Sequence, residues 1–184
     1  MATRNDSQKS SGRKRLLKGK YKDLIADVDR IQAYRRDFSV DASRWKQFQA
    51  PIALAWSKLR FSEANRSHVP KERGLYAFTL AHEPSDFPGH GFIMYVGITG
   101  DTSKATLRTR YGQYLAHLRR GNGRPKVYGM LKRWDGDLFF NFVSVPDRNV
   151  SLTAIEDDLL AAVLPPVNET YIKAGLQAIL KDAW

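Results

Sequence analysis

The chain has 184 residues, a length that suits one domain or one domain with an extension. Hydrophobic residues make up 42% and charged residues 27%, which is typical of a globular protein that can bury a core. There is no cysteine, which excludes disulfides and thiolate zinc sites. Because the sequence also lacks a long apolar run and an apolar leader, we expect a cytoplasmic protein with no membrane partner.

The charge is strongly basic and clustered. Thirty Lys and Arg against nineteen Asp and Glu leave a net charge of +11. Residues 1–20 hold seven basic groups and one acid, and residues 101–133 hold nine basic groups and one acid. Net charge alone fits a merely soluble basic protein equally well, but the clustering favours a polyanion partner, chiefly nucleic acid.

The first part of the chain predicts a basic arm followed by helices. Residues 1–20 have almost nothing to bury, which predicts a disordered arm. Residues 21–70 predict a helical N-terminal extension. Apolar residues recur there at helical spacing from Leu24 to Tyr34, and Asp41 is placed to cap a second helix that ends before Pro51.

The remainder, residues 71–184, predicts a domain of a different kind. Short aromatic-rich strands are expected at 74–80, 91–98 and 138–145, and the first two should form a hairpin around the loop 81–90.

Helices are expected between and after these strands, at 106–120, 127–134 and 171–182, with another that begins after Ser151 and ends at Leu164. The order predicts an α+β fold, in which a small three-stranded antiparallel sheet is covered by helices.

Several residues of this domain suit phosphodiester hydrolysis. That reaction needs an attacking water, stabilisation of charge on the phosphate and help for the leaving oxygen. A metal-binding carboxylate at Glu156, a cation at Arg110 and phenols at Tyr76 and Tyr95 would supply these functions. Taken singly, each has an ordinary interpretation: a cross-strand aromatic pair, a nonspecific phosphate contact, or an acidic first turn of a helix.

The order of these residues resembles the GIY-YIG nuclease superfamily over residues 74–170. Gly74-Leu75-Tyr76 precedes Tyr95-Val96-Gly97, and Arg110 follows on the next helix, about one turn ahead of Tyr114. Glu156 then begins a helix, and Asn168 follows twelve residues later, just beyond a proline. Each tripeptide is common by chance, whereas five elements in this order are specific.

The resemblance implies a role for each residue. Glu156 resembles the sole protein ligand of one divalent metal ion, Mg²⁺ or Mn²⁺. Tyr76 resembles the residue that orients or deprotonates the attacking water, which would require its pKa to be lowered. Arg110 resembles a phosphate clamp, and Tyr95 and Tyr114 would line the site.

Three further residues look structural, and a larger set looks suited to nucleic acid. Gly74, Gly97 and Asn168 resemble supports, the last through bonds from its side chain to backbone. The candidate nucleic-acid contacts are all basic: Arg13, Lys14, Arg15, Lys104, Arg108, Arg119, Arg120, Arg124 and Lys126.

The sequence departs from the family pattern in two places. The link from Tyr76 to Tyr95 is longer than usual, and loop 81–90 accounts for the excess. Some members carry a Lys directly after the second motif, where Ile98 stands here; Lys104 or Arg108 could substitute for it.

These features lead us to expect a metal-dependent endonuclease, with DNA favoured over RNA as its substrate. The position of the module late in the chain resembles compact restriction or anti-phage members, which suggests host defence. Two alternatives stay open: a non-catalytic nucleic-acid-binding module, or a nuclease subunit active only in a larger complex. In the latter case the N-terminal helices would form the interface with a partner subunit or a second copy.

Overall fold

The computed structural model describes residues 26, 28–81 and 91–168. The chain divides into two units, Met1–Asp37 and Phe38–Trp184. In the first unit residues 28–34 are helical, and Val28, Ile31 and Tyr34 are exposed. The predicted arm 1–20, with Arg13, Lys14 and Arg15, and the predicted helix 171–182 lie outside the described residues. No helix among the described residues is long and apolar enough to cross a membrane.

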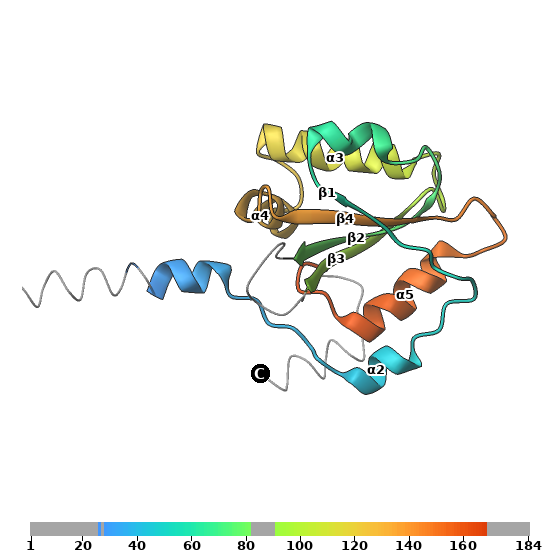
Figure 1. The fold of residues 1–184 in the computed structure, drawn as a ribbon, viewed down its shortest axis with the longest axis horizontal. Coiled ribbons are helices and arrows are strands. Elements are labelled where there is room, and N and C mark those ends of the chain that lie inside the picture. The colour runs from blue at the N-terminus through green and yellow to red at the C-terminus, as the bar shows by residue number, and fades with distance from the viewer. Residues whose placement is uncertain (1–25, 27, 82–90, 169–184) are drawn as a thin grey trace, which may run out of the picture. The chain divides into compact units, whose positions relative to one another are not determined.

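The second unit is built on one antiparallel sheet of four strands in the order β1-β4-β2-β3 (Figure 1). The strands are β1 (Ser57–Arg60), β2 (Gly74–Ala81), β3 (Gly91–Thr99) and β4 (Leu138–Ser144). The expected α+β class and the β2–β3 hairpin are confirmed.

The expectation of three strands is wrong, because β1 adds a fourth. It pairs with β4 and lies within the stretch that we predicted to be a helical extension. Only Leu59 of this edge strand is partly buried. Lys58 and Arg60 lie over the ring of Phe139, at 4.1 and 4.9 Å from its centroid. A short, charged edge strand lacks the alternating apolar pattern by which strands are recognised.

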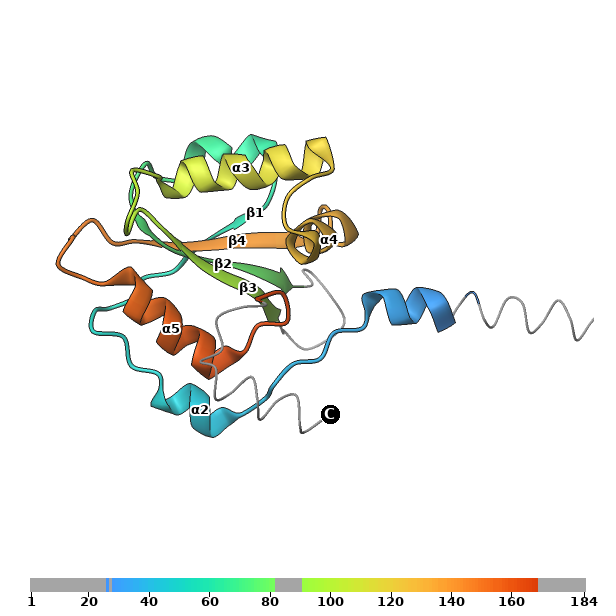
Figure 2. The ribbon, with the colours of Figure 1, turned by 180° about the vertical axis from the view of Figure 1, so that it is seen from behind.

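Helices cover both faces of the sheet (Figure 1, and from behind in Figure 2). On one face lie η1 (Glu63–His68), α3 (Leu107–Arg120) and α4 (Pro125–Arg133), and on the other lie α2 (Ala42–Gln47) and α5 (Leu152–Val163). Strand β2 is therefore buried on both sides. Its Tyr76 and Phe78 pack under α3, while Leu75 and Ala77 belong to the core clusters on the α5 side.

The helix starts follow from their capping residues. Thr106 forms a capping box with Thr109 at the start of α3, Ser151 accepts a hydrogen bond from the backbone N–H of Ala154, and the Asp41 carboxylate caps α2. These contacts confirm the predicted starts at Ser151 and Asp41. They also fix the rotation of α3 and α5, and hence which side chains face the sheet.

A buried arginine joins the elements that bear the candidate site. Arg73, directly before β2, is 7% exposed, and its guanidinium donates to the Asp101 carboxylate at 2.6 Å and to the Val150 carbonyl at 3.1 Å. Asp101, two residues beyond the end of β3, also accepts from the hydroxyl of Thr153 in the first turn of α5 at 2.7 Å. The bond from Thr153, the backbone N–H groups of Leu152 and Thr153 and the guanidinium of Arg73 lower the pKa of Asp101 against the effect of burial.

Asp101→Asn should therefore lower the free energy of unfolding at pH 7 by about 3 kcal/mol, since it leaves the Arg73 charge buried without its partner. A carboxylate with a lowered pKa stabilises the fold above its unfolded pKa near 4, and that contribution is lost as the pH falls through the lower folded value. Urea unfolding at pH 7 and at about pH 3 should thus show a gap between wild type and variant that narrows in acid. A gap of constant size would contradict this account.

Candidate active site

The ring of Tyr76 lies across the neighbouring strand at Gly97. Tyr76 is 2% exposed and pairs in register with Gly97 on β3. A Cβ atom at Gly97 would lie 2.5 Å from the Tyr76 hydroxyl, so only glycine leaves room for it. On its other side the ring stacks on Phe140, with the centroids 5.3 Å apart. The hydroxyl of Tyr76 is therefore held in one place by the absence of a side chain on β3.

Three tyrosines meet around this point. The hydroxyls of Tyr76 and Tyr114 are 2.8 Å apart and hydrogen-bonded. The Tyr95 ring lies 6.2 Å from that of Tyr76 and 6.3 Å from that of Tyr114, centroid to centroid. All three side chains are buried and come from β2, β3 and α3. The structure thus brings together the three tyrosines that the sequence singled out.

The environment keeps two of these phenols, those of Tyr76 and Tyr114, protonated. Burial, followed by the charges that Tyr114 and Tyr95 would bear, raises the pKa of Tyr76 well above its usual value. Burial likewise raises the pKa of Tyr114. A role for Tyr76 in deprotonating water would require its pKa to be lowered. With its pKa raised by the surrounding residues, Tyr76 is a hydrogen-bond donor rather than a base at neutral pH.

Arg110 lies one turn before Tyr114 on α3 and is only partly engaged. Its Nη1 donates to the side chain of Gln113 at 3.0 Å. Its Nε is buried and has no hydrogen-bond partner among the residues described. A buried donor without an acceptor costs stability, and such groups gather where a ligand or ion completes the bonding.

Arg124 supplies a second cation to the tyrosine cluster. Its Nη2 donates to the Tyr95 hydroxyl at 2.8 Å, and its guanidinium carbon lies 5.6 Å from the Tyr95 ring centroid. The sequence grouped Arg124 with the general nucleic-acid contacts. Nothing in its local pattern distinguishes it from the other basic residues, because its contact depends on the fold of the α3–α4 turn.

Glu156 brings the single carboxylate of the predicted site. It lies on α5, partly buried, between the core residues Ile155 and Leu159. Burial and then the charge of Asp157 raise its pKa to about 7, while the guanidiniums of Arg124 and Arg110 favour the ionised form. Glu156 thus responds to both cations of the tyrosine cluster, although it comes from the helix on the other side of the sheet.

The predicted supports occupy close contacts around the cluster. The Asn168 side chain accepts from the Val96 N–H at 2.9 Å and donates to the Val96 carbonyl at 2.8 Å, and so holds the outer edge of β3. A Cβ atom at Gly74 would overlap the carbonyl of Val143 on β4. These contacts fix the strands on which Tyr76 and Tyr95 stand.

The other basic candidates are not all gathered here. Arg108 donates to the carbonyls of Val69 and Ser67 at 2.6 and 2.7 Å, so its guanidinium is engaged with backbone. Arg119 pairs with Glu63 at 3.7 Å. Arg119 follows Arg110 by nine residues, which places it on the opposite side of α3.

Lys104, Arg120 and Lys126 are exposed. We had considered Lys104 and Arg108 as substitutes for the cation that some family members carry at the position of Ile98. At the tyrosine cluster the additional cation comes from Arg124. Ile98 itself packs with Leu75 on the α5 side of the sheet.

The described part of the chain contains no group of three or more His, Cys, Asp or Glu side chains placed so that they could hold a metal ion together. A metal ion at the tyrosine cluster would therefore have Glu156 as its carboxylate, with water and substrate oxygens completing the shell. The donor chemistry fits Mg²⁺ or Mn²⁺, which prefer such hard oxygen ligands.

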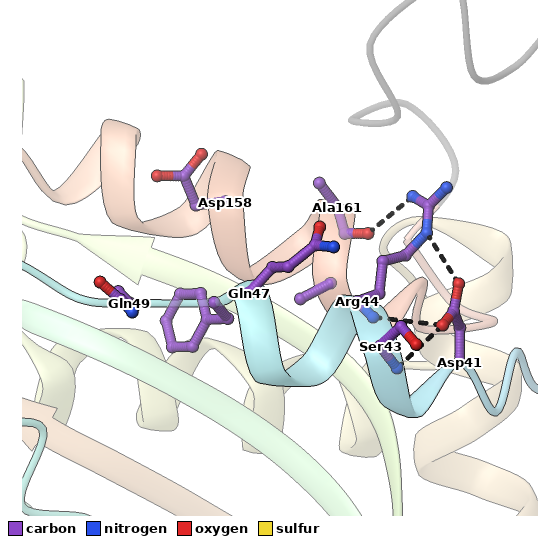
Figure 3. Close-up of a pocket in the computed structure, with 9 residues that line it drawn as sticks. Asp41, Ser43, Arg44, Gln47, Gln49, Asp158 and Ala161 are labelled. Atoms are coloured by element: carbon purple, nitrogen blue, oxygen red, sulfur yellow. Dashed lines mark hydrogen bonds and ion pairs between the residues drawn. The ribbon is translucent and has the colours of Figure 1, made fainter.

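A hollow lies away from the tyrosine cluster, between α2 and α5 (Figure 3). Its volume is about 560 Å³. Arg44 spans it, donating to the Ala161 carbonyl at 3.1 Å and pairing with Asp41 at 3.4 Å. Asp158, from α5, also lines it. The Arg44 contacts connect α2 to α5, and the tyrosines lie on the opposite face of the sheet.

Comparison with known proteins gives no relative: no family model matches the sequence, and neither a curated protein nor a solved structure matches the chain.

Glu156→Gln should make the protein more stable in mild alkali. A carboxyl whose folded pKa is raised stabilises the fold fully below its unfolded pKa, near 4.3, and loses that contribution as the pH rises through about 7. The variant should exceed wild type by about 1–2 kcal/mol in free energy of unfolding at pH 8, after allowance for solvent screening, and by little at pH 4.5. Asp158→Asn, at an exposed position, is the matched control and should show no such gain.

Gly97→Ala should lower the free energy of unfolding by about 1–3 kcal/mol, because the new methyl group must displace the Tyr76 ring. Gly129→Ala serves as the control, since a Cβ atom there meets nothing within 4 Å and alanine favours the helix. Chemical denaturation of both variants makes the comparison. Equal stability of the two would show that Gly97 is not required for the placement of Tyr76.

Proposed function

We propose that this protein is a metal-dependent endonuclease of the GIY-YIG type, which hydrolyses phosphodiester bonds in DNA. The observation that supports this most directly is the convergence of Tyr76, Tyr114, Tyr95 and Arg110, from β2, β3 and α3, at a cluster whose cations also act on Glu156 of α5. Residues selected by motif order alone thus meet around one point. A chance assortment of common tripeptides would have no reason to do so.

The residues suit a phosphodiester as the ligand. Two neutral phenols, Tyr76 and Tyr114, can donate to phosphate oxygens or to an attacking water. The Nε of Arg110, which has no hydrogen-bond partner among the described residues, would gain an acceptor from a phosphate oxygen. Such fixed donors stabilise the negative charge that develops as the bond to the leaving oxygen breaks.

Glu156 is the residue that would hold Mg²⁺ or Mn²⁺. Its raised pKa reflects burial and the neighbouring charge of Asp157, and a divalent cation would favour its ionised form. When bound, the ion supplies positive charge for the phosphate and lowers the pKa of coordinated water. Tyr76, next to Tyr114, would orient water rather than remove its proton unaided.

The basic segment 101–133 favours nucleic acid as the partner, of which DNA is the substrate we propose, with restriction or anti-phage defence as its setting. A binding module without chemistry would lack a use for a partly buried carboxylate with a pKa near 7, which favours the enzyme over that alternative. A nuclease subunit that needs a partner for activity is a separate alternative, and its experimental outcome differs from those of the other two.

The deciding experiment is cleavage of plasmid, single-stranded DNA and RNA by purified protein with Mg²⁺, with Mn²⁺ and with EDTA. Wild type should cut DNA only with the divalent ion, and Glu156→Gln should reduce the rate by about a thousandfold or more, as expected for loss of a metal ligand. Asp158→Asn should cut like wild type. Cutting that persists in Glu156→Gln would point to a contaminant and remove support for the enzyme.

Thermal unfolding adds a measurement independent of turnover. Because a ligand that binds only the folded state stabilises it, Mg²⁺ should raise the Tm of wild type at pH 8 and leave that of Glu156→Gln unchanged. A Tm shift without cutting would favour the partner-dependent subunit. Neither shift nor cutting, with DNA binding retained, would favour the binding module.

A further inference from the structure

Arg124 stands on a turn whose backbone is tightly specified. Helix α3 ends at Gly121 with a left-handed φ of +65°, and Gly123 follows with a φ of +107°. A Cβ atom at Gly123 would lie 2.8 Å from the Nδ1 atom of His117, so the turn packs closely on α3. Arg124 then caps α4 with extended backbone ahead of Pro125, which begins that helix. The turn therefore directs Arg124 by packing and backbone conformation.

Within the part of the chain that the structure describes, the guanidinium of Arg124 is anchored at one end. One N–H donates to the Tyr95 hydroxyl at 2.8 Å, and the residue is otherwise exposed. A guanidinium has five N–H donors in a planar fork. Among the residues that the structure describes, Tyr95 is the hydrogen-bond acceptor found for it. Most of the fork is therefore left to face solvent beside the tyrosine cluster.

Arg124 and Arg110 act electrostatically on the same groups. Both guanidiniums favour the ionised form of Glu156, and Arg110 likewise acts on Tyr76 and Tyr114. The two arginines reach the cluster from different supports, the interior of α3 and the α3–α4 turn. With the protonated phenols, they form a set of donors that comes entirely from protein and needs no metal ion to attract an anion.

We propose that Arg124 is a second phosphate-contacting residue, which with Arg110 binds the nonbridging oxygens of the phosphodiester at the tyrosine cluster before any metal ion is bound. The proposal rests on the proposed function for the identity of the ligand, a DNA phosphodiester. It makes a separate claim, that substrate binding is independent of the divalent ion. Arg124 differs in this from Arg108, whose guanidinium already serves two backbone carbonyls.

Binding should be measured in EDTA by fluorescence anisotropy with a short labelled DNA duplex, using the Glu156→Gln protein so that no cutting occurs. Arg124→Gln should weaken binding by about ten- to a hundredfold, the effect of one charge-assisted hydrogen bond. Arg148→Gln, at an exposed arginine in the β4–α5 loop, removes the same charge and should change binding far less. Arg124→Lys should recover part of the loss, because it keeps the charge but not the fork.

Tyr95→Phe separates contact with phosphate from mere positioning of Tyr95. If Arg124 touches the phosphate, Arg124→Gln should still weaken binding severalfold in the Tyr95→Phe background. Complete loss of the Arg124 effect there would overturn the proposal, and so would equal binding by Arg124→Gln and Arg148→Gln. Unfolding curves of each variant confirm that the folded protein is being compared.

The two proposals fail in different ways. Wild type that cuts DNA while Arg124→Gln binds and cuts like Arg148→Gln would overturn the role of Arg124 and leave the nuclease standing. Wild type that cuts nothing, with binding still lost selectively in Arg124→Gln, would overturn the nuclease and support the phosphate contact.

Discussion

The passage of the Tyr76 ring across β3 at Gly97 is the constraint on which the candidate site depends. A side chain at Gly97 would occupy the space of the hydroxyl, and the stack on Phe140 prevents the ring from moving the other way. The hydroxyl thus reaches Tyr114 on α3 at hydrogen-bonding distance. The buried strand β2 thereby places a polar group at the interface between the sheet and α3. The fold supplies rigidity there because the residue is part of the sheet core.

The charges of the site are arranged around this neutral centre. Arg124 donates to the Tyr95 hydroxyl, the charges of Arg124 and Arg110 favour the ionised form of Glu156, and burial raises the pKa of Tyr76 and of Tyr114. The Arg73–Asp101 pair connects the start of β2, the end of β3 and the first turn of α5. The Arg73–Asp101 ion pair therefore helps to position Glu156 relative to the tyrosines. The same contact therefore contributes both to the stability of the fold and to the geometry of the site.

Local sequence patterns were sufficient for most elements and insufficient for side-chain partners. Helices α3 and α5 could be predicted because apolar spacing and capping residues are local signals. Strand β1 was missed because its burial rests on Leu59 alone, at an edge. The tyrosines could be named from motif order. The partners of the arginines could not be predicted. Arg124 donates to Tyr95 and Arg108 donates to backbone carbonyls, and this difference depends on the fold rather than on the residue type.

Asn168 has a consequence for how copies of this protein behave toward one another. The amide of its side chain occupies both the N–H and the carbonyl of Val96, and the adjacent Val167 N–H donates to the Met94 carbonyl at 3.1 Å. Strand β3 is an outer strand of the sheet, and unpaired outer strands recruit strands from other molecules. Asn168, which holds the strand that carries Tyr95, thus also blocks part of the sheet edge from pairing with strands of other molecules. This protects the protein against aggregation.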